Sequence, residues 1–341
     1  MRKKLLCILA ILCLILTSCK STDISYISKT DLIMGTIVDI QIYGHTDNSI
    51  LEAAMKRLKH IEEIMSINIK DSELSKININ SGIKKVAVSD DTFNVLETSL
   101  YYAKLSDGKF DPTIAPLVKL WGIGSDEAKV PSDKQLRQAL NLIDYTKVKL
   151  YPDDKSVFLE QEGMGLDLGA IAKGYSADQV HKLLRDKGVK SAIINIGGNI
   201  IALGKHPKGS PWNIGIQDPN KPTGNYMGIL KSYNSSIVTS GIYERYLDVD
   251  NQKLHHILDV STGYPANNDI LSVTIINKSS IDGDALSTVA FLLGSTDALS
   301  LIESIPNTEC IIITKNNEVY LSSGVKDNFI LSNNYYTIKN H

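Results

Sequence analysis

The segment Asp282–Phe291, DGDALSTVAF, places two carboxylates, a serine and a threonine at the start of an apolar run. Asp284, Ser287 and Thr288 have the spacing i, i+3, i+4, so on a helix they would share one face. Three oxygen ligands on one face suit a hard cation such as Mg²⁺. The same residue types cap helices, because the first backbone N–H groups of a helix have no partner. Taken alone, the segment favours a helix cap, and a metal site is the alternative.

A second segment with chemical potential is Leu166–Asp178, LDLGAIAKGYSAD, in which Asp167 directly precedes a predicted helix. Small residues at Gly169 and Ala170 would let a ligand approach the backbone, and the start of a helix favours an anion there. Lys173, one turn later, is placed to meet a phosphate or a ring edge of that ligand. A capping aspartate and a surface lysine form the simpler interpretation of this motif on its own.

Paired glycines follow a predicted strand in INIGGNI, at Gly197 and Gly198. Their backbone N–H groups could form an anion-binding concavity. A tight hairpin is an equally good interpretation. The segment is neither a GxGxxG dinucleotide fingerprint nor a P-loop. Further along, HILDVSTGYPA begins with His256, and the sequence alone does not separate its role from that of His255.

The N-terminus indicates where the protein resides. Arg2, Lys3 and Lys4 precede an apolar run that is shorter than a membrane span of about 20 residues. The run ends in LTSC, which is similar to a bacterial lipobox, whose cysteine is lipidated. An ordinary signal peptide with an incidental cysteine is the alternative. We expect residues 1–18 to be a lipoprotein signal peptide, Cys19 to carry the lipid, and residues 19–30 to be a tether. The protein would then be extracytoplasmic and anchored to the cell membrane.

Composition sets limits on the partners of the remaining chain. We expect residues 31–341 to form one domain, since no break is rich enough in Pro, Gly or Ser to mark a boundary. The formal net charge of −2 and the lack of a long basic run argue against nucleic acid as a partner. Cys310 is the single cysteine after Cys19, so a bound metal would need oxygen ligands.

The elements that position these residues are mixed, and we expect an α+β fold with a largely antiparallel sheet and packed helices. A helix over 49–65 is predicted to open with a capping box of Ser49 and Glu52, and a helix over 170–187 to end at Gly188. Further helices are expected at 92–105, after 132, at 284–293 and at 296–302. Strands are expected at 36–43, 191–196, 200–203, 213–216, 228–233, 256–260 and 270–276, with hairpins at 147–160 and 310–322.

Seven segments, in this order, resemble the FAD:protein FMN transferase family, also called the ApbE family. They are MGT at 34–36, DGKFDPTIAPLVKLWGIG at 107–124, DLGAIAKGY at 167–175, NIGGN at 195–199, TSGIYER at 239–245, HILDVSTGYP at 256–265 and DGDALSTVAF at 282–291. Each is weak alone, and the match that they form in this order runs over nearly the whole mature chain. Val260 stands where the family usually has proline, and Gly283 where alanine is common; neither departure removes a functional group.

The resemblance implies an α+β core with a flavin-binding cleft, FAD as the donor substrate and Mg²⁺ beside its pyrophosphate. FMN would be joined through its phosphate to a Thr or Ser of an acceptor protein, and AMP would leave. By motif position, the metal ligands would be the Ala170 carbonyl, Asp284 and Thr288, with Ser287 nearby. The implied FAD contacts are Met34, Lys109, Phe110, Asp111, Asp167, Lys173, Gly197, Gly198 and the region of His256 and Ile257.

The acceptor hydroxyl has a high pKa, so a general base would assist the transfer. A histidine with the ordinary pKa of about 6.5 suits that role near neutral pH. We assign it to His256, with Asp282 as the second candidate.

Two other functions stay open at this point. The same site could transfer the phosphoryl group to water, which would make the protein an FAD pyrophosphatase. The chain could also be a non-catalytic flavin-binding lipoprotein. Asp284 and Thr288 count against a pure binder, because binding alone does not need a metal beside the pyrophosphate.

Overall fold

The computed structural model describes residues 25–250 and 252–339. The predicted signal peptide and Cys19 lie outside these residues. Within them, no helix combines the length and the apolar character needed to cross a membrane.

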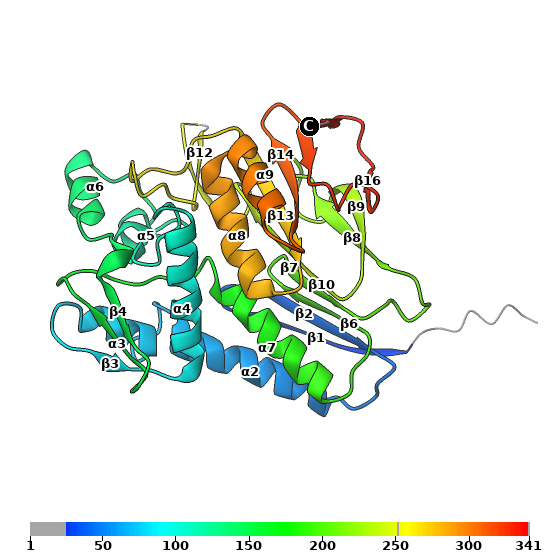
Figure 1. Cartoon of the computed structure of the whole chain (residues 1–341), viewed down its shortest axis with the longest axis horizontal. Helices are drawn as coiled ribbons and strands as arrows, with labels where there is room; N and C mark the ends of the chain where they lie inside the picture. The colour runs from blue at the N-terminus through cyan, green and yellow to red at the C-terminus, as the bar shows by residue number, and fades with distance from the viewer. Residues whose placement is uncertain (1–24, 251, 340–341) are drawn as a thin grey trace, which may run out of the picture.

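A nine-stranded sheet forms the centre of the molecule, in the order β1-β2-β6-β7-β10-β13-β14-β15-β17 (Figure 1). Every neighbouring pair is antiparallel except β15 and β17. This confirms the predicted α+β class with a largely antiparallel sheet. The strands are β1 Tyr26–Ile33, β2 Thr36–Tyr43, β6 Ala192–Ile196, β7 Asn199–Leu203, β10 Ser235–Gly241, β13 Ile270–Asn277, β14 Glu309–Thr314, β15 Glu318–Leu321 and β17 Thr337–Lys339.

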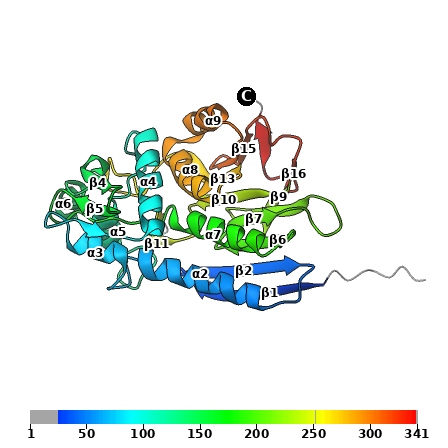
Figure 2. The same cartoon turned by 60° about the horizontal axis from the view of Figure 1, so that its bottom comes forward.

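Alternating side chains bury both faces of this sheet. On β7, Ile201 belongs to a cluster with α2 and α7, whereas Ala202 packs in a cluster with the small sheet β16-β9-β8. Helices therefore cover one face and three strands cover the other (Figure 2). The elements concerned are α2 Ser49–Met65, α7 Ala172–Asp186, α8 Ser280–Leu293, α9 Ser295–Ser304, β8 Trp212–Gln217, β9 Tyr226–Ser232 and β16 Phe329–Leu331.

The remaining elements lie together beside the N-terminal ends of α7 and α8, on the left of Figure 1. They are α3 Glu73–Ile79, α4 Asp90–Leu105, α5 Ala115–Trp121, α6 Asp133–Leu140, the 3-10 helix Tyr145–Lys147 and the sheet of β3 Val86–Ala87, β4 Val148–Tyr151 and β5 Ser156–Leu159. A hairpin of β11 Tyr246–Val249 and β12 Gln252–His255 completes the fold.

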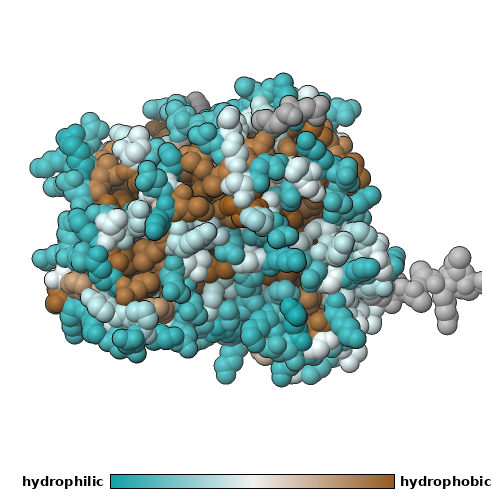
Figure 3. All heavy atoms as spheres, in the orientation of Figure 1, coloured by the Kyte–Doolittle hydropathy of each residue, from teal (hydrophilic) through white to brown (hydrophobic). Residues whose placement is uncertain are grey.

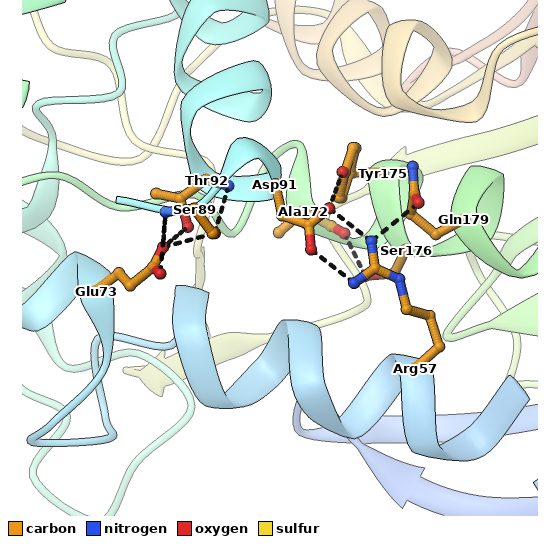
Figure 4. A network of polar contacts seen from close by, with 9 residues as sticks. All are labelled: Arg57, Glu73, Ser89, Asp91, Thr92, Ala172, Tyr175, Ser176 and Gln179. Carbon is orange, nitrogen blue, oxygen red and sulfur yellow. Dashed lines mark hydrogen bonds and ion pairs between the residues drawn. The ribbon is translucent and has the colours of Figure 1, made fainter. Parts of the chain in front are cut away.

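A polar network fixes the position of α7 against α2 and α4 (Figure 4). The guanidinium of Arg57 on α2 donates two hydrogen bonds of 2.6 Å to Asp91 on α4, and a third of 2.9 Å to Gln179 on α7. The Tyr175 hydroxyl of α7 donates to the same carboxylate. Arg57 also holds the pKa of Asp91 below its usual value. Bidentate pairing of this kind restricts orientation as well as distance, so the first turns of α7 are held in place.

Three sequence predictions about elements are wrong. Ser49 is the first residue of α2, and it donates to Asp47 instead of forming a capping box with Glu52, which pairs with Lys29. Residues 256–260 are not a strand, because β12 ends at His255. The predicted tether is too long, because its last five residues already belong to β1, which begins at Tyr26.

Candidate active site

The hydrogen bonds in the first turn of α8 show which residues cap this helix. The N-cap is Ser279, whose hydroxyl accepts from the Asp282 backbone N–H. Asp178 of α7 supplies a second cap, since its two carboxylate oxygens accept from the N–H groups of Ser280 and Ile281, each over 2.9 Å. Burial nevertheless raises the pKa of Asp178 to about 6. The capping interpretation of Asp284 is therefore wrong, and sequence reasoning overlooked Asp178 in this role.

Asp284 instead joins α8 to the start of α7. The residue is 3% exposed, its Oδ2 accepts the Gly174 backbone N–H over 2.8 Å, and its Oδ1 lies 3.7 Å from Lys173 Nζ. Gly174 is the third residue of α7, and the first N–H groups of a helix have no partner within it, so Asp284 satisfies one of them. Ala170 precedes the N-cap Ile171, and its carbonyl accepts no hydrogen bond from the described residues. A buried carboxylate and a cation thus meet at the start of α7, and an unpaired carbonyl stands two residues before the helix begins.

The hydroxyls of α8 differ in their availability. Ser287 is fully buried, and its Oγ donates to the Asp284 carbonyl over 2.8 Å and shares a 2.7 Å hydrogen bond with Ser240 on β10. It therefore ties α8 to the sheet, and the structure does not support its expected place in the metal site. Thr288 is only half-buried, and its hydroxyl has no hydrogen-bond partner within the part of the chain that the structure describes.

The three oxygen donors that remain fit a hard cation. Asp284 offers a carboxylate, Thr288 a hydroxyl and Ala170 a backbone carbonyl, which is the ligand chemistry of Mg²⁺ or Ca²⁺. No group of three or more His, Cys, Asp or Glu side chains in the described ranges is arranged to bind a metal ion.

The two adjacent histidines have different environments. His255 is buried, donates through Nε2 to the Ala266 carbonyl and packs edge-on against Phe291, so it belongs to the core. His256 is half-exposed, and both its backbone N–H and its ring Nδ1 bond the Arg245 carbonyl. Since a carbonyl only accepts, Nδ1 of His256 carries the proton and Nε2 keeps its lone pair.

The electrostatics of His256 differ from the sequence expectation. Desolvation and the nearby charges of Lys173 and Arg245 lower its pKa to about 4. The expected ordinary histidine pKa is therefore wrong, and the ring is neutral over a wider pH range. Asp282, the second candidate base, accepts a 2.9 Å hydrogen bond from the Tyr102 hydroxyl.

Glu244 is a residue that sequence reasoning missed. It is solvent-exposed, yet the surrounding protein desolvates its carboxyl and, together with the charge of Asp284, raises its pKa to about 7 against the opposing effects of Lys173 and Arg245. Its position beside Arg245 in TSGIYER was the available signal. The structure thus adds a titratable carboxyl to the surroundings of Lys173 and Asp284.

The predicted flavin contacts fall into two groups. In the first group, every side chain is buried or already hydrogen-bonded within the protein. Phe110 and Ile257 are buried in the main core cluster, so these side chains cannot contact a ligand there. The carboxylate of Asp111 is also buried, and it accepts from the Thr113 N–H and hydroxyl and from the Tyr145 N–H. Phe110 and Asp111 lie in the loop that follows α4, and Ile257 lies just after β12. The expectation of direct contact through these three side chains is not supported.

The residues of the second group of predicted flavin contacts have side chains that remain available to contact a ligand. Lys109 is exposed on the same loop, and Asp167 is half-buried, accepts the Gly169 N–H over 2.7 Å and has its pKa raised by burial. Met34 lies in the β1–β2 turn with a φ of 56°, where its N–H donates to Glu62 and its sulfur accepts from Ser176 of α7. These contacts bring the β1–β2 turn to the first turns of α7.

The paired glycines form the turn of the β6–β7 hairpin. Both have positive φ, 58° at Gly197 and 96° at Gly198, as a two-residue hairpin turn requires. The Gly197 N–H donates to the Ile37 carbonyl and the Gly198 N–H to Asn195 Oδ1. The hairpin interpretation is therefore confirmed, and the anion-binding concavity is wrong because both N–H groups are used internally. A Cβ on Gly197 would lie 2.3 Å from Thr36 Oγ1, so the turn packs directly on the β1–β2 turn.

Comparison with known proteins decides the family. The family model described as ApbE family matches residues 34–312. This chain belongs to the ApbE family. A protein named FAD:protein FMN transferase from Treponema pallidum is 36% identical over 318 residues, covering 88% of each chain. A Klebsiella pneumoniae protein of the same name is 37% identical over 296 residues, covering 87% of this chain and 92% of its own.

Solved ApbE structures share the fold. The ApbE protein of Thermotoga maritima superposes with a TM-score of 0.80 at 33% identity, over 89% of this chain and 99% of its own. The flavin transferase ApbE of Vibrio cholerae gives a TM-score of 0.79 at 28% identity, with the same coverage. The resemblance of the seven segments to the ApbE family is thus confirmed.

Proposed function

We propose that this chain is an FAD:protein FMN transferase, which moves FMN from FAD to a Thr or Ser hydroxyl of an acceptor protein and releases AMP. The observation that carries the proposal is the meeting of Asp284 and Lys173 at the α7–α8 contact, together with the unpaired carbonyl of Ala170 two residues before α7 begins. This set can hold a cation and a phosphate together. Relatives named FAD:protein FMN transferase cover most of the chain.

The donor set supports Mg²⁺ as the cofactor, held by Asp284, Thr288 and the Ala170 carbonyl. When bound, the ion would neutralise charge on the pyrophosphate of FAD. Lys173 adds a fixed positive charge beside Asp284, and its Nζ also donates to the Gly169 carbonyl over 3.2 Å. Transfer from a pyrophosphate depends mainly on such positioning and charge neutralisation.

His256 is the proposed base. The acceptor oxygen forms a bond to the phosphorus of the FMN half, and the bond from that phosphorus to the bridging oxygen breaks. AMP leaves with the bonding electron pair, and the hydroxyl proton passes to His256 Nε2. The hydrogen bond from Nδ1 to the Arg245 carbonyl orients the ring for this transfer and sets its tautomer.

The LTSC motif supports a proposal for the location of the protein. We propose that Cys19 is lipidated and that the protein is an extracytoplasmic, membrane-anchored lipoprotein. Cys19→Ala should abolish lipid labelling and leave the leader uncleaved by the lipoprotein peptidase. Equal labelling of the wild type and the variant would exclude the anchor.

One incubation tests the proposed activity. The protein is mixed with FAD, Mg²⁺ and a candidate acceptor protein, and AMP and covalently bound flavin are measured together. Equal amounts of AMP and flavinylated acceptor support the transferase. AMP with free FMN and no acceptor modification would identify a pyrophosphatase instead, and bound FAD without AMP would identify a binding protein.

A further inference from the structure

Four loops gather at the end of the molecule where the described chain begins, on the right of Figure 1. The Gly44 N–H donates to the Ser25 carbonyl, and the Tyr43 N–H to the Ser191 carbonyl. The Ser191 hydroxyl donates to the Lys205 carbonyl over 2.8 Å. The Asn234 N–H donates to the Gly204 carbonyl, which brings in the β9–β10 turn. We call this the anchor-end surface, and it comprises Ser25, Tyr26, Tyr43 and residues 44–48, 185–191, 204–211 and 232–235.

The charge of the anchor-end surface is opposite in sign to that of the whole chain. It carries five cationic side chains, all exposed: Arg185, Lys187, Lys190, Lys205 and Lys208. It carries two acidic ones, Asp47 and Asp186, and Asp186 is paired with Lys182 over 2.5 Å. The formal charge of the full chain is −2. This end therefore carries a local excess of positive charge, and Figure 3 shows mostly hydrophilic and intermediate residues there.

An aromatic cluster underlies the same surface. Tyr26 and Tyr43 face each other across β1 and β2 with ring centroids 5.4 Å apart, and Tyr43 continues to Trp212 at 5.5 Å. His206 packs edge-on against Trp212 at 5.0 Å. Tyr26 is 55% exposed and Tyr233, in the β9–β10 turn, 59% exposed. Exposed tyrosines above a packed aromatic base suit the headgroup layer of a membrane, where one end of the ring is wet.

The distance along the chain to Cys19 is short. Six residues, Lys20–Ser25, separate it from Tyr26. Six residues span at most about 22 Å even when fully extended. A lipid on Cys19 would thus keep the anchor-end surface near the bilayer, where exposed charges interact over a Debye length of about 8 Å.

We propose that the anchor-end surface rests on an anionic lipid bilayer and gives the anchored protein one preferred orientation. This inference depends on the lipid anchor proposed above. The lysines face the anionic headgroups, and Tyr26 and Tyr233 enter the headgroup layer. The lipid anchor keeps the protein close to the bilayer, and the anchor-end surface determines which side of the protein faces the bilayer.

The test compares two labelled forms of the lipidated full chain, each carrying one fluorophore. One label is attached at Lys208→Cys on the anchor-end surface. The other is attached at Gln138→Cys on α6, which lies at the opposite end of the molecule in Figure 1. Cys310 is fully buried and does not compete for the label. Vesicles of phosphatidylcholine, with or without phosphatidylglycerol, carry a headgroup quencher. We expect at least about twofold stronger quenching at position 208 than at 138 in the anionic vesicles, and a smaller difference in the neutral ones.

Matched charge reversals complete the test. The triple variant Lys187→Glu, Lys190→Glu, Lys205→Glu should remove the difference in quenching. The control Lys129→Glu, Lys134→Glu, Arg137→Glu, at exposed positions around α6, should preserve it. Equal quenching at both labels, or a difference unchanged by the first triple variant, would overturn the proposed orientation. If the labelled wild type does not float with the vesicles in a flotation assay, the lipid anchor is absent. The proposed orientation, which depends on the anchor, would then be rejected as well.

Discussion

Gly174 donates its backbone N–H to Asp284 Oδ2 over 2.8 Å, and this bond joins the first turn of α7 to the second turn of α8. The two helices meet so closely that a Cβ at Gly174 would lie 2.2 Å from the Ser280 carbonyl oxygen and 2.7 Å from the Asp284 Cβ. Only glycine fits this contact. The Ala170 carbonyl, one residue before the N-cap Ile171, accepts no hydrogen bond from the described residues and is therefore available as a ligand.

Gly174→Ala should therefore separate α7 from α8 and impair the site. We expect a loss of stability of about 1–3 kcal/mol, as for other overpacked cores, together with weaker Mg²⁺ binding. Thermal unfolding and titration calorimetry measure the two effects. Gly283→Ala is the matched control, because it is also helical and its added methyl would meet side-chain atoms and no backbone, Val238 Cγ2 at 3.0 Å and Asn277 Oδ1 at 3.2 Å. Equal effects of the two substitutions would contradict the proposed role of the Gly174 contact.

Asp284→Asn tests the metal separately from packing. The amide oxygen can still accept the Gly174 N–H, so the fold should persist while the negative charge is lost. We expect flavin transfer to be abolished and FAD binding to decrease less than turnover, with EDTA producing the same result in the wild type. Ser279→Ala, which removes the actual cap of α8, should cost about 0.5–2 kcal/mol and leave transfer intact. Full activity in EDTA would exclude a metal-dependent reaction.

The histidines provide a paired comparison. His256→Ala should retain FAD and slow flavin transfer by about 10²–10⁴-fold, the usual contribution of a general base. His255→Ala should leave transfer close to normal in the folded protein and lower its stability, because His255 is buried against Phe291. In the wild type, transfer should show no histidine titration near pH 6.5, since the pKa of His256 is lowered to about 4. Normal transfer by His256→Ala would move the base to Asp282.

Acid should destabilise the fold through His255. Desolvation lowers its pKa from 6.5 to about 4 in the folded protein, so between these values the unfolded chain binds more protons. The stabilisation is therefore complete above about pH 6.5 and is lost as the pH falls towards 4, by an amount on the order of 1–3 kcal/mol. Urea unfolding at pH 7.0 and pH 4.5 measures this loss. His255→Gln should show a smaller loss over the same interval, and an equal loss would assign it to other groups.

Local patterns predicted many of the elements well. The helix that ends at Gly188 and the hairpin around Pro152 follow from turn residues whose backbone preferences are strong, and both are present. Strand β1 was missed because it lies at the edge of the sheet, and of its eight residues only Ile33 is buried. Without an apolar alternation, its sequence reads as polar linker. The Ser49 capping box failed because Asp47 offers the helix start a nearer carboxylate.

The family of the chain could be recognised from the sequence, but the arrangement of its site could not. Asp284 and Gly174 are 110 positions apart, and only the packing of α7 on α8 brings them together. The same holds for Asp178, whose role as a cap depends on a helix that begins about 100 residues later. Asp111 was expected as a ligand contact from the family resemblance, and the paired glycines were expected because their backbone N–H groups are uncommitted in the sequence. In the fold, those groups are already hydrogen-bonded.

Helix α7 runs from Ala172, one residue before Lys173 at the Asp284 contact, to Asp186 at the anchor-end surface. At 1.5 Å per residue, its 15 residues measure about 22 Å. Because Arg57 clamps the helix and α8 packs across its start, this length acts as a rigid spacer. If the anchor-end surface rests on the bilayer, the reaction takes place at a fixed height above the lipid headgroups. An acceptor embedded in the same membrane would then have to present its hydroxyl at that height, on a projecting loop or an external domain.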